Sequence, residues 1–373
     1  MDFSFTEEQQ MLRDTARRFL DDKAPTEVVR SLMETDEGFD SGLWSDIATQ
    51  GWQAMAIPED RGGAGFTFLE MAILMEEMGR TLFPAPYLSS IVLGADLVMT
   101  VATDEQQKEI LPDVAAGETR LALAHLEASG RWDEEGIQME ARSDGSDLVL
   151  DGTKTFVLDG HTAHRLLVPV RTAAGVSIVV VDADAGGVER RRLETMDMTR
   201  KQAEVSFDGV RVPSSAVLGE PGAGWPALEQ TLRRAAVALA YEQVGGAQRC
   251  MEMSVDYAKV RVQFGRPIGS FQAIKHKCAD MLVQVESAKS AAYHAGWAAT
   301  ADPAELAVVS HLAKSYCSEA FFFCAAENIQ IHGGIGFTWE HDAHLYFKRA
   351  KTDELLFGSP AYHRGLLADA LGI

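Results

Sequence analysis

The sequence predicts an α+β chain in which two helical regions flank a region of short strands. Helical periodicity dominates about the first 118 residues and everything after residue 222, and β-rich runs separated by turn residues fill the interval. A chain of 373 residues is longer than one compact domain usually is. We therefore expect three domains, residues 1–118, 119–222 and 223–373, with no internal repeat and no low-complexity linker.

Composition and charge exclude several classes of protein. Hydrophobic residues make up 46% and charged residues 24%, an ordinary balance that excludes wholesale disorder. The 34 Lys and Arg against 55 Asp and Glu give a net charge of −21. Such a surface repels nucleic acid and anionic membranes, so we expect neither as a main partner. We also find no apolar run that approaches the roughly 18 residues of a membrane span.

The start of the chain and its cysteines indicate a reducing compartment. The first residues, MDFSFTEEQQ, are acidic and lack the basic and apolar regions of a signal peptide. The four cysteines form no CxxC pair and no metal-ligand pattern, so we interpret them as reduced, buried thiols in a cytoplasmic protein; they are Cys250, Cys278, Cys317 and Cys324.

In the first region, two capping boxes predict helix starts. Thr6 and Thr103 are each followed three residues later by a Gln that can reach back to the cap. Apolar side chains at helical spacing follow the first box and recur between the two, at Leu12, Ala16, Phe19 and Leu20 and at Phe68, Met71, Ala72, Met75 and Met78. The run 58–65 (PEDRGGAG) is expected to be a loop.

The middle region has the signals of a small antiparallel sheet or barrel. Short β-rich runs are bounded by turn signals at Asp151-Gly152, at 185–187 and at Asp208-Gly209. The runs are Leu148–Leu150, Leu166–Val170, Val176–Val181 and Ala203–Val212. No helices alternate with them, so a βαβ array is not expected.

Long helical patterns return at Pro226, which suits a first helical turn. We expect Ser270 to cap a second helix and residues 304–330 to form a third. Three Gly-rich stretches, 62–65, 222–224 and 333–336, do not follow a strand within a βαβ unit, so a Rossmann site is not expected.

Two histidine pairs have a spacing that suits metal binding, but no third ligand accompanies them. They are His161 with His164 and His341 with His344. Because surface and core histidines are far commoner than metal ligands, no metal site is expected.

Two motifs in the last third point to chemistry. Residues 261–272 (RVQFGRPIGSFQ) place a guanidinium beside an aromatic ring between two helices, a combination that can grip a pyrophosphate and pack an adenine. Residues 330–337 (QIHGGIGF) place backbone without side chains where a phosphate can approach. Each motif alone has an ordinary interpretation: a helical turn with a solvated Arg, and a helix C-cap.

Together, about 60 residues apart and in this order, the motifs resemble the acyl-CoA dehydrogenase family of flavoproteins. The turn 205–213 (VSFDGVRVP) and Leu218-Gly219-Glu220 are similar to that family's middle-domain signature. The resemblance implies an N-terminal helical domain, a middle antiparallel β-barrel or sheet, and a C-terminal four-helix bundle. It also implies an acyl-CoA substrate, FAD bound across a subunit interface, a tetramer, and an electron-transfer flavoprotein as acceptor.

The resemblance assigns the adenine side of the FAD site to residues that this chain retains. In the family, the Arg and Phe of RxxFG serve the adenylate and pyrophosphate of a neighbour's FAD, and the GxFQ and QxxGG elements complete that side. The matching residues are Arg261, Phe264, Gln272, Gln330, Gly333 and Gly334.

The flavin-ring side departs from the family pattern. The family's Trp-x-Thr, whose Trp stacks on the flavin and whose Thr hydrogen-bonds it, is matched by Phe156 and Leu158. Leu158 has no hydrogen-bond donor. The usual Thr-Glu-x-x-x-Gly-Ser-Asp loop is reduced to residues 126–131 (LEASGR).

The catalytic base also departs from the pattern. The family abstracts the α-proton of an acyl thioester with a Glu in one of two places, and a gapless match puts Phe357 and Ala235 there, with Ala236 where an Arg is usual. Glu242 and Glu354 are nearby carboxylates. At about 1.5 Å per residue, Glu242 lies roughly 10 Å along the helix from Ala235, too far to replace it without a shift in register.

Three functions therefore remain open. The first is an FAD-dependent acyl-CoA dehydrogenase with a relocated base, acting as a homotetramer; of the three, we favour the half-site subunit described next. Alternatively the chain is a half-site subunit, similar to the adenine-side (β-type) chains of the α₂β₂ acyl-CoA dehydrogenases of actinobacterial sterol catabolism. The third is a non-enzymatic scaffold on this fold, against which the retained Arg261, Phe264 and Gly333 argue.

Overall fold

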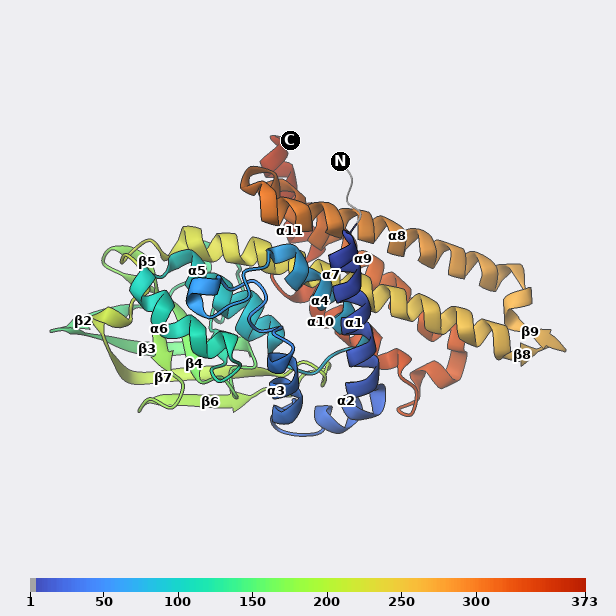
Figure 1. Ribbon diagram of the computed structural model, residues 1–373, viewed down its shortest axis with the longest axis horizontal. Coiled ribbons are helices and arrows are strands. Elements are labelled where there is room, and N and C mark those ends of the chain that lie inside the picture. Colours follow the sequence, from blue (N-terminus) through green and yellow to red (C-terminus); the bar gives the residue numbers. More distant parts are fainter. Residues whose placement is uncertain (1–4) are drawn as a thin grey trace. The chain divides into compact units, whose positions relative to one another are not determined.

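The computed structural model describes residues 5–373, which divide into two compact units (Figure 1). The helical unit comprises residues up to 30, 68–83 and 236–373, and the sheet unit comprises 31–67 and 84–235. Helices flank a β region in chain order, so the predicted α+β class is confirmed. The domain boundaries at 118 and 222 stay predictions.

The helical unit contains helices from the first and last parts of the chain. They are α1 (Glu7–Lys23), the start of α2 (Thr26–Met33), α4 (Phe68–Thr81), the larger part of α7 (Gly224–Val260), α8 (Gln272–Ala301), α9 (Pro303–His332), α10 (Ala343–Leu355) and α11 (Pro360–Leu371). Asp302 alone connects α8 to α9, and its carboxylate caps α9 by accepting from the backbone N–H groups of Ala304 and Glu305.

Local capping signals were predicted correctly in two places and wrongly in one. The boxes at Thr6–Gln9 and Thr103–Gln106 are both formed, with hydroxyl and amide bonding reciprocally. Ser270 does not cap α8. It lies in the one-turn helix η5 (Ile268–Ser270), and its hydroxyl donates to the carbonyl of Pro267 at 2.7 Å, so α8 starts after Phe271 without a side-chain cap.

Two glycines let α4 and α7 approach each other closely within the helical unit. A Cβ at Gly245 would lie 1.9 Å from the carbonyl oxygen of Glu76, and a Cβ at Gly79 would lie 2.1 Å from that of Glu242. These distances are far below contact, so the crossing requires glycine on both helices.

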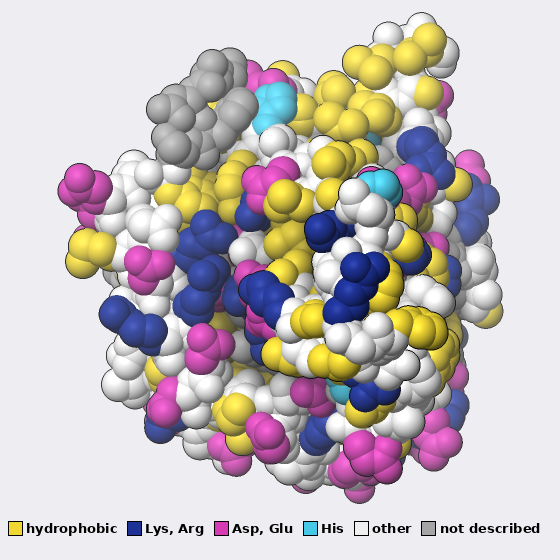
Figure 2. All heavy atoms as spheres, turned by 90° about the vertical axis from the view of Figure 1, so that its right-hand side faces the viewer, with side chains coloured by type: hydrophobic (Ala, Val, Ile, Leu, Met, Phe, Trp, Pro, Cys, Tyr) yellow, Lys and Arg dark blue, Asp and Glu magenta, His cyan; other side chains and the backbone are white. Residues whose placement is uncertain are grey.

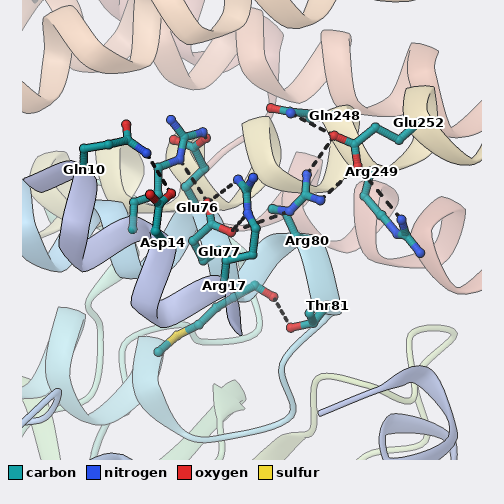
Figure 3. Close-up of polar contacts among 12 residues, drawn as sticks. Gln10, Asp14, Arg17, Glu76, Glu77, Arg80, Thr81, Gln248, Arg249 and Glu252 are labelled. Carbon is teal, nitrogen blue, oxygen red and sulfur yellow. Dashed lines mark hydrogen bonds and ion pairs between the residues drawn. The ribbon is translucent and has the colours of Figure 1, made fainter. Parts of the chain in front are cut away.

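Charged side chains buried between α1, α4 and α7 tie these helices together (Figure 3). Arg17 makes two hydrogen bonds of 2.8 Å to the Glu77 carboxylate, and Arg80 makes two of 2.9 and 3.1 Å to Glu252. Burial raises the pKa of Glu76 while the guanidinium of Arg13, 2.5 Å away, opposes that rise. Arg13, Arg17 and Arg80 all lie within ion-pair distance of Glu77, so this buried carboxylate is compensated by more than one guanidinium.

The sheet unit pairs two small sheets with several helices. The helices are α3 (Ser41–Thr49), α5 (Asp96–Val101), α6 (Asp104–Ala115), the π-helix η2 (Leu88–Ala95) and the one-turn η1 (Glu59–Arg61), η3 (Glu134–Gly136) and η4 (Ser214–Ala216). The run 58–65, predicted to be a loop, thus contains a single 3₁₀ turn.

The strands form two sheets that share one hydrophobic core. One sheet has the order β1 (Leu121–Leu123), β4 (Arg165–Thr172), β5 (Gly175–Asp182), and the other has β2 (Ala141–Asp144), β3 (Asp147–Leu158), β7 (Gln202–Pro213), β6 (Val188–Arg192). Apolar side chains from both sheets, including Val168, Val205 and Phe207, make up the core. The ladders are antiparallel except that β1 runs parallel to β4, which the antiparallel prediction missed.

Two predicted turns lie on the two sides of one β-bulge instead. Asp151-Gly152 lies inside β3 and Asp208-Gly209 inside β7, where the pairing shifts register between Leu150 and Gly152. The Asp151 carboxylate accepts from the N–H of Gly209 at 2.7 Å. Asp-Gly is a hairpin signal, but here both dipeptides lie within paired strands, and the Asp151 carboxylate satisfies the N–H of Gly209 at the bulge.

A survey of residues 5–373 finds no helix both long and apolar enough to cross a membrane.

The α4–α7 crossing generates a first prediction. Gly245→Ala forces the backbones of the two helices apart and should lower the free energy of unfolding by about 1–3 kcal/mol. Gly365 lies on α11, and a Cβ there would meet nothing within 4 Å. Gly365→Ala should therefore raise the free energy of unfolding by about 0.5–1 kcal/mol through helix propensity. Urea denaturation followed by circular dichroism measures both. Equal effects of the two variants would contradict the close crossing.

Candidate cofactor and active site

The hairpin between α7 and α8 is strained and exposed. Strands β8 (Val262–Gln263) and β9 (Arg266–Pro267) pair around Phe264 and Gly265, whose φ angles are +53° and +76°. Positive φ at both central positions favours Asn-Gly, and a Phe there costs about 1–2 kcal/mol. The Phe264 ring is nevertheless 92% exposed. Strain combined with an exposed aromatic ring indicates a binding function rather than a stabilising one.

The two predicted motifs meet at one end of the helical unit. The rings of Tyr257, near the end of α7, and His332, at the end of α9, stack with centroids 4.3 Å apart. Lys277, in the second turn of α8, bonds Glu327 of α9 at 2.5 Å. These contacts bring the hairpin, the start of α8 and the end of α9 together, and with them all six predicted cofactor residues, each of which is exposed: Arg261, Phe264, Gln272, Gln330, Gly333 and Gly334.

The glycine pair at the end of α9 leaves the backbone open. Gly333 has φ 66° and ψ −143°, a conformation essentially restricted to glycine. A Cβ at Gly334 would meet nothing within 4 Å. Gly333 is therefore required by the chain's own fold, whereas Gly334 is not, and its lack of a side chain leaves room for something outside the chain.

Positive and apolar side chains gather where these motifs lie. On the face shown in Figure 2, which includes the hairpin end at the right of Figure 1, Lys and Arg surround hydrophobic side chains. Lys259, Arg261, Arg266 and Lys275 are exposed on this part of the chain, and the Arg266 guanidinium lies 4.2 Å from the Phe271 ring centroid. Guanidinium and side-chain amide groups, beside glycine backbone that carries no side chain, form a surface that fits the anionic pyrophosphate of a dinucleotide.

The predicted flavin-ring positions lie in the sheet unit, at the end of β3. Phe156 has φ +52° and is 51% exposed, so its ring is presented outward. Leu158 is buried and offers no donor. Asp159, also at positive φ, receives a 2.6 Å hydrogen bond from the Ser89 hydroxyl. This segment keeps an aromatic face but not the hydrogen bond that a Thr would supply.

The shortened loop 126–131 is fastened by an ion pair. The buried ammonium of Lys154 donates to the Glu127 carboxylate at 2.7 Å and to the carbonyl of Pro169 at 2.8 Å. The carbonyl of Leu126 accepts from Thr155 at 2.8 Å. Glu127 is thus engaged in holding the loop to the sheet.

The two predicted base positions hold no carboxylate. Phe357 is buried in the turn after α10 with φ +60°, and Ala235 is buried in α7 next to Ala236, which is also buried. Of the two nearby carboxylates, Glu242 is 2% exposed and bonds Arg349 of α10 at 2.7 Å. Glu354 is partly buried and bonds Lys351 at 2.9 Å.

Three buried polar residues at the Phe357 turn were not predicted. Lys314 and His311 lie on α9 and His363 on α11, and Lys314 and His363 both bond carbonyls of the turn. A lysine within the apolar stretch 306–325 is a signal of a paired, buried cation, but which partners it has depends on how the helices pack.

No group of three or more His, Cys, Asp or Glu able to hold a metal occurs in the described part of the chain. The pairs with metal-like spacing have other contacts: His164 accepts from the backbone N–H of Arg120 at 3.1 Å, and His344 bonds the carbonyl of Trp339 at 3.2 Å. Cys250, Cys317 and Cys324 are buried free thiols, as predicted, and Cys278 is partly exposed.

Comparison with protein families gives three matches that together span most of the chain. Models of the acyl-CoA dehydrogenase N-terminal domain, middle domain and C-terminal domain match residues 6–118, 122–210 and 222–372.

Relatives and solved structures agree with these matches. The acyl-CoA dehydrogenase IpdE2 of Mycobacterium tuberculosis is 36% identical over 364 residues, which cover 95% of this chain and 94% of the relative. Butyryl-CoA dehydrogenase from Megasphaera elsdenii superposes with a TM-score of 0.92 at 25% identity, covering 100% of both chains. A chain of the ChsE4–ChsE5 complex from Mycobacterium tuberculosis gives 0.91 at 28% identity, covering 100% of this chain and 99% of that one.

The paired state of Glu242 generates a second prediction. Glu242→Gln breaks a buried ion pair with Arg349 and should lower the free energy of unfolding by about 3–5 kcal/mol. Glu354→Gln, which removes a more exposed pair, should change it by about 0.5 kcal/mol or less. Chemical denaturation measures both.

The double variant Glu242→Leu/Arg349→Met provides the control. Because it removes both charges, it should lose less stability than Glu242→Gln alone. A Glu242→Gln variant as stable as wild type would contradict a structural role for this carboxylate.

Proposed function

The chain belongs to the acyl-CoA dehydrogenase family, and on that premise we propose that it supplies the adenylate and pyrophosphate side of an FAD site while lacking the base of the dehydrogenation. The proposal rests on a difference between the cofactor side of the site, which is complete, and the base positions, which hold no carboxylate. The exposed RxxFG hairpin and the QxxGG turn are complete, whereas Phe357 and Ala235 stand where the family has its Glu. Such a chain is a half-site subunit.

On the cofactor side, Arg261 binds the pyrophosphate through its planar fork of donors and Phe264 packs against the adenylate. Gln272 and Gln330 add amide donors, and the backbone at Gly333 and Gly334 approaches the phosphates closely. The cofactor, when bound, supplies the acceptor for a hydride from the β-carbon of the acyl thioester. Because Phe264 is exposed in the single chain, we infer that it reaches the cofactor of a neighbouring subunit.

On the acyl side, the backbone N–H of Phe357 donates to the thioester carbonyl and stabilises developing negative charge on its oxygen. Abstraction of the α-proton needs a carboxylate within hydrogen-bond reach. Glu242 does not serve, because it is buried against Arg349. The chain thus binds and polarises a thioester but has no acceptor for its proton.

The missing groups imply a homologous partner. We propose an α-type subunit that supplies the Glu and the flavin-ring pocket, in an α₂β₂ tetramer. The similarity to a chain of a complex of two differently named proteins, ChsE4 and ChsE5, supports this assembly. By family resemblance the electron acceptor is an electron-transfer flavoprotein, and the setting is lipid or sterol catabolism in the cytoplasm.

The second candidate is a self-sufficient homotetramer in which Glu354 is the relocated base. Its position three residues before Phe357, partly exposed, is the observation that favours it. The turnover experiment below separates it from the half-site.

The assignment of the cofactor side predicts FAD affinity. Arg261→Ala removes a charge-assisted pair worth on the order of 2–4 kcal/mol, so FAD should bind about 30- to 900-fold more weakly. Gly334→Val introduces a side chain that meets nothing in its own chain and should fold normally but bind FAD poorly. Titration of FAD, followed by flavin fluorescence, measures both.

Lys259→Ala is the matched control, since it removes an exposed cation two residues before Arg261. It should weaken FAD binding by only a small factor. If Arg261→Ala bound FAD as tightly as this control, or Gly334→Val as tightly as wild type, the assignment would be wrong.

The absence of a catalytic base predicts that the chain alone turns over acyl-CoA very slowly. General-base catalysis is typically worth about 10²–10⁴-fold, so the chain alone, kept in excess FAD, should bleach the flavin very slowly when mixed anaerobically with a panel of acyl-CoAs. Phe357→Glu should recover a small part of the rate, limited by Leu158, which offers the flavin ring no hydrogen bond.

Rapid bleaching by wild type alone, abolished by Glu354→Gln or Glu242→Gln, would overturn the half-site proposal and identify the base. The scaffold alternative is excluded by any FAD-dependent bleaching in the presence of the partner subunit.

A further inference from the structure

The turn between α10 and α11 is held in an unfavourable conformation. Phe357 has φ +60° and Gly358 has φ +107°. A non-glycine residue in the left-handed region costs about 1–2 kcal/mol and persists only where its surroundings determine it. A Cβ at Gly358 would also lie 2.3 Å from Cδ1 of Tyr362, so the turn is packed tightly against α11.

A buried ammonium holds both sides of this turn. Lys314 of α9 is 0% exposed, and its Nζ donates to the carbonyls of Glu354 and Gly358, each at 3.2 Å. Its third contact is the Ser318 hydroxyl at 2.9 Å. An ammonium has three donors, so the two turn carbonyls and this hydroxyl use all of them.

A buried imidazole holds the middle of the turn. Nε2 of His363 lies 3.0 Å from the carbonyl oxygen of Phe357, and its Nδ1 lies 3.0 Å from Nδ1 of His311. Because a carbonyl only accepts, Nε2 of His363 carries the hydrogen, and the Nδ1 of a neutral His363 then accepts from His311. Burial, together with Lys314 and His311, lowers the pKa of His363 to about 3, which keeps this donor arrangement at neutral pH.

The carbonyls of residues 354, 357 and 358 are therefore fixed by side chains from two other helices. In a peptide plane the carbonyl and the adjacent N–H are rigidly coupled. The N–H of Phe357 shares its plane with the carbonyl of Leu356, which lies between the held carbonyls of Glu354 and Phe357. Holding both ends of this short segment limits the directions in which that N–H can point.

We propose that Lys314 and His363 are positioning residues that orient the backbone N–H of Phe357 toward the thioester carbonyl. This inference rests on the proposed function, in which that N–H polarises the substrate. Neither side chain is assigned contact with the substrate. Their effect is to prevent the turn from relaxing to a conformation in which the donor is misdirected, which is electrostatic preorganisation.

The test uses acyl-CoA that the wild-type chain binds but does not dehydrogenate. Because the wild-type chain does not remove the α-proton, saturated acyl-CoAs labelled with carbon-13 at the carbonyl remain intact when bound. Isotope-edited infrared spectroscopy of the chain, kept in excess FAD, should show the carbonyl stretch shifted to lower frequency by the hydrogen bond. Lys314→Met and His363→Met, which keep side-chain length but remove the donors, should lose most of this shift.

Two further variants separate positioning from simple stability. His363→Gln keeps a donor at the place of Nε2 and should restore the shift lost in His363→Met. Lys289→Met, which removes a lysine of α8 paired with Glu286, should leave the shift unchanged. Hydrogen–deuterium exchange should accelerate in residues 355–359 of Lys314→Met and not in the rest of the chain.

The possible results are distinguishable. If wild type shows the shift and folded Lys314→Met and His363→Met keep it, this inference is wrong and the proposed function stands. The inference is also wrong, with the proposed function intact, if His363→Gln behaves like His363→Met. If wild type binds the thioesters without a shift, or binds none of them, the proposed role of the Phe357 N–H fails, and the inference fails with it.

Discussion

The helical unit depends on carboxylates buried against guanidinium groups. The buried Glu77 links α4 to α1 through Arg17, and the buried Glu242 links α7 to α10 through Arg349. The half-buried Glu252 links α7 to α4 through Arg80. Once charges are buried in pairs, neither partner is available for another task, because losing one leaves the other unpaired in a poorly solvated interior. Glu242, which the sequence offers as a possible base, is one of these paired carboxylates, and it binds α7 to α10 through Arg349.

The cofactor-side residues and the residues at the predicted base and flavin-ring positions differ in exposure and in chemistry. The hairpin at Phe264 and the turn at Gly333 are exposed, and Phe264 adopts a left-handed conformation that is costly for a non-glycine residue. The side chains of Phe357 and Leu158 are buried and cannot accept a proton. We interpret the first pair as surfaces completed by a neighbour. The side chains of the second pair supply neither an acceptor for a proton nor a hydrogen-bond donor. Both features fit a subunit that contributes one half of a shared cofactor site.

How much the sequence predicted depends on how local each feature is. The capping boxes at Thr6 and Thr103 were predicted correctly, because a box involves only four consecutive residues. Asp151-Gly152 was misjudged as a turn, because a bulge differs from a turn only through the partner strand. Strands such as β6 (Val188–Arg192) were missed since their sequences are short and charged. Lys314 was missed because its carbonyl partners come from the end of α10 and the turn after it, which lie about 40 residues further along the chain.

We interpret this chain as the provider of only the adenine side of the site, and FAD stoichiometry tests that interpretation most directly. The chain is purified alone and together with a homologous subunit that carries the Glu, and flavin absorbance per polypeptide is measured after desalting. We expect little retained flavin on the chain alone and one FAD for each pair of different chains in the complex. One tightly held FAD per polypeptide on the chain alone, with no gain from the partner, would contradict the half-site interpretation.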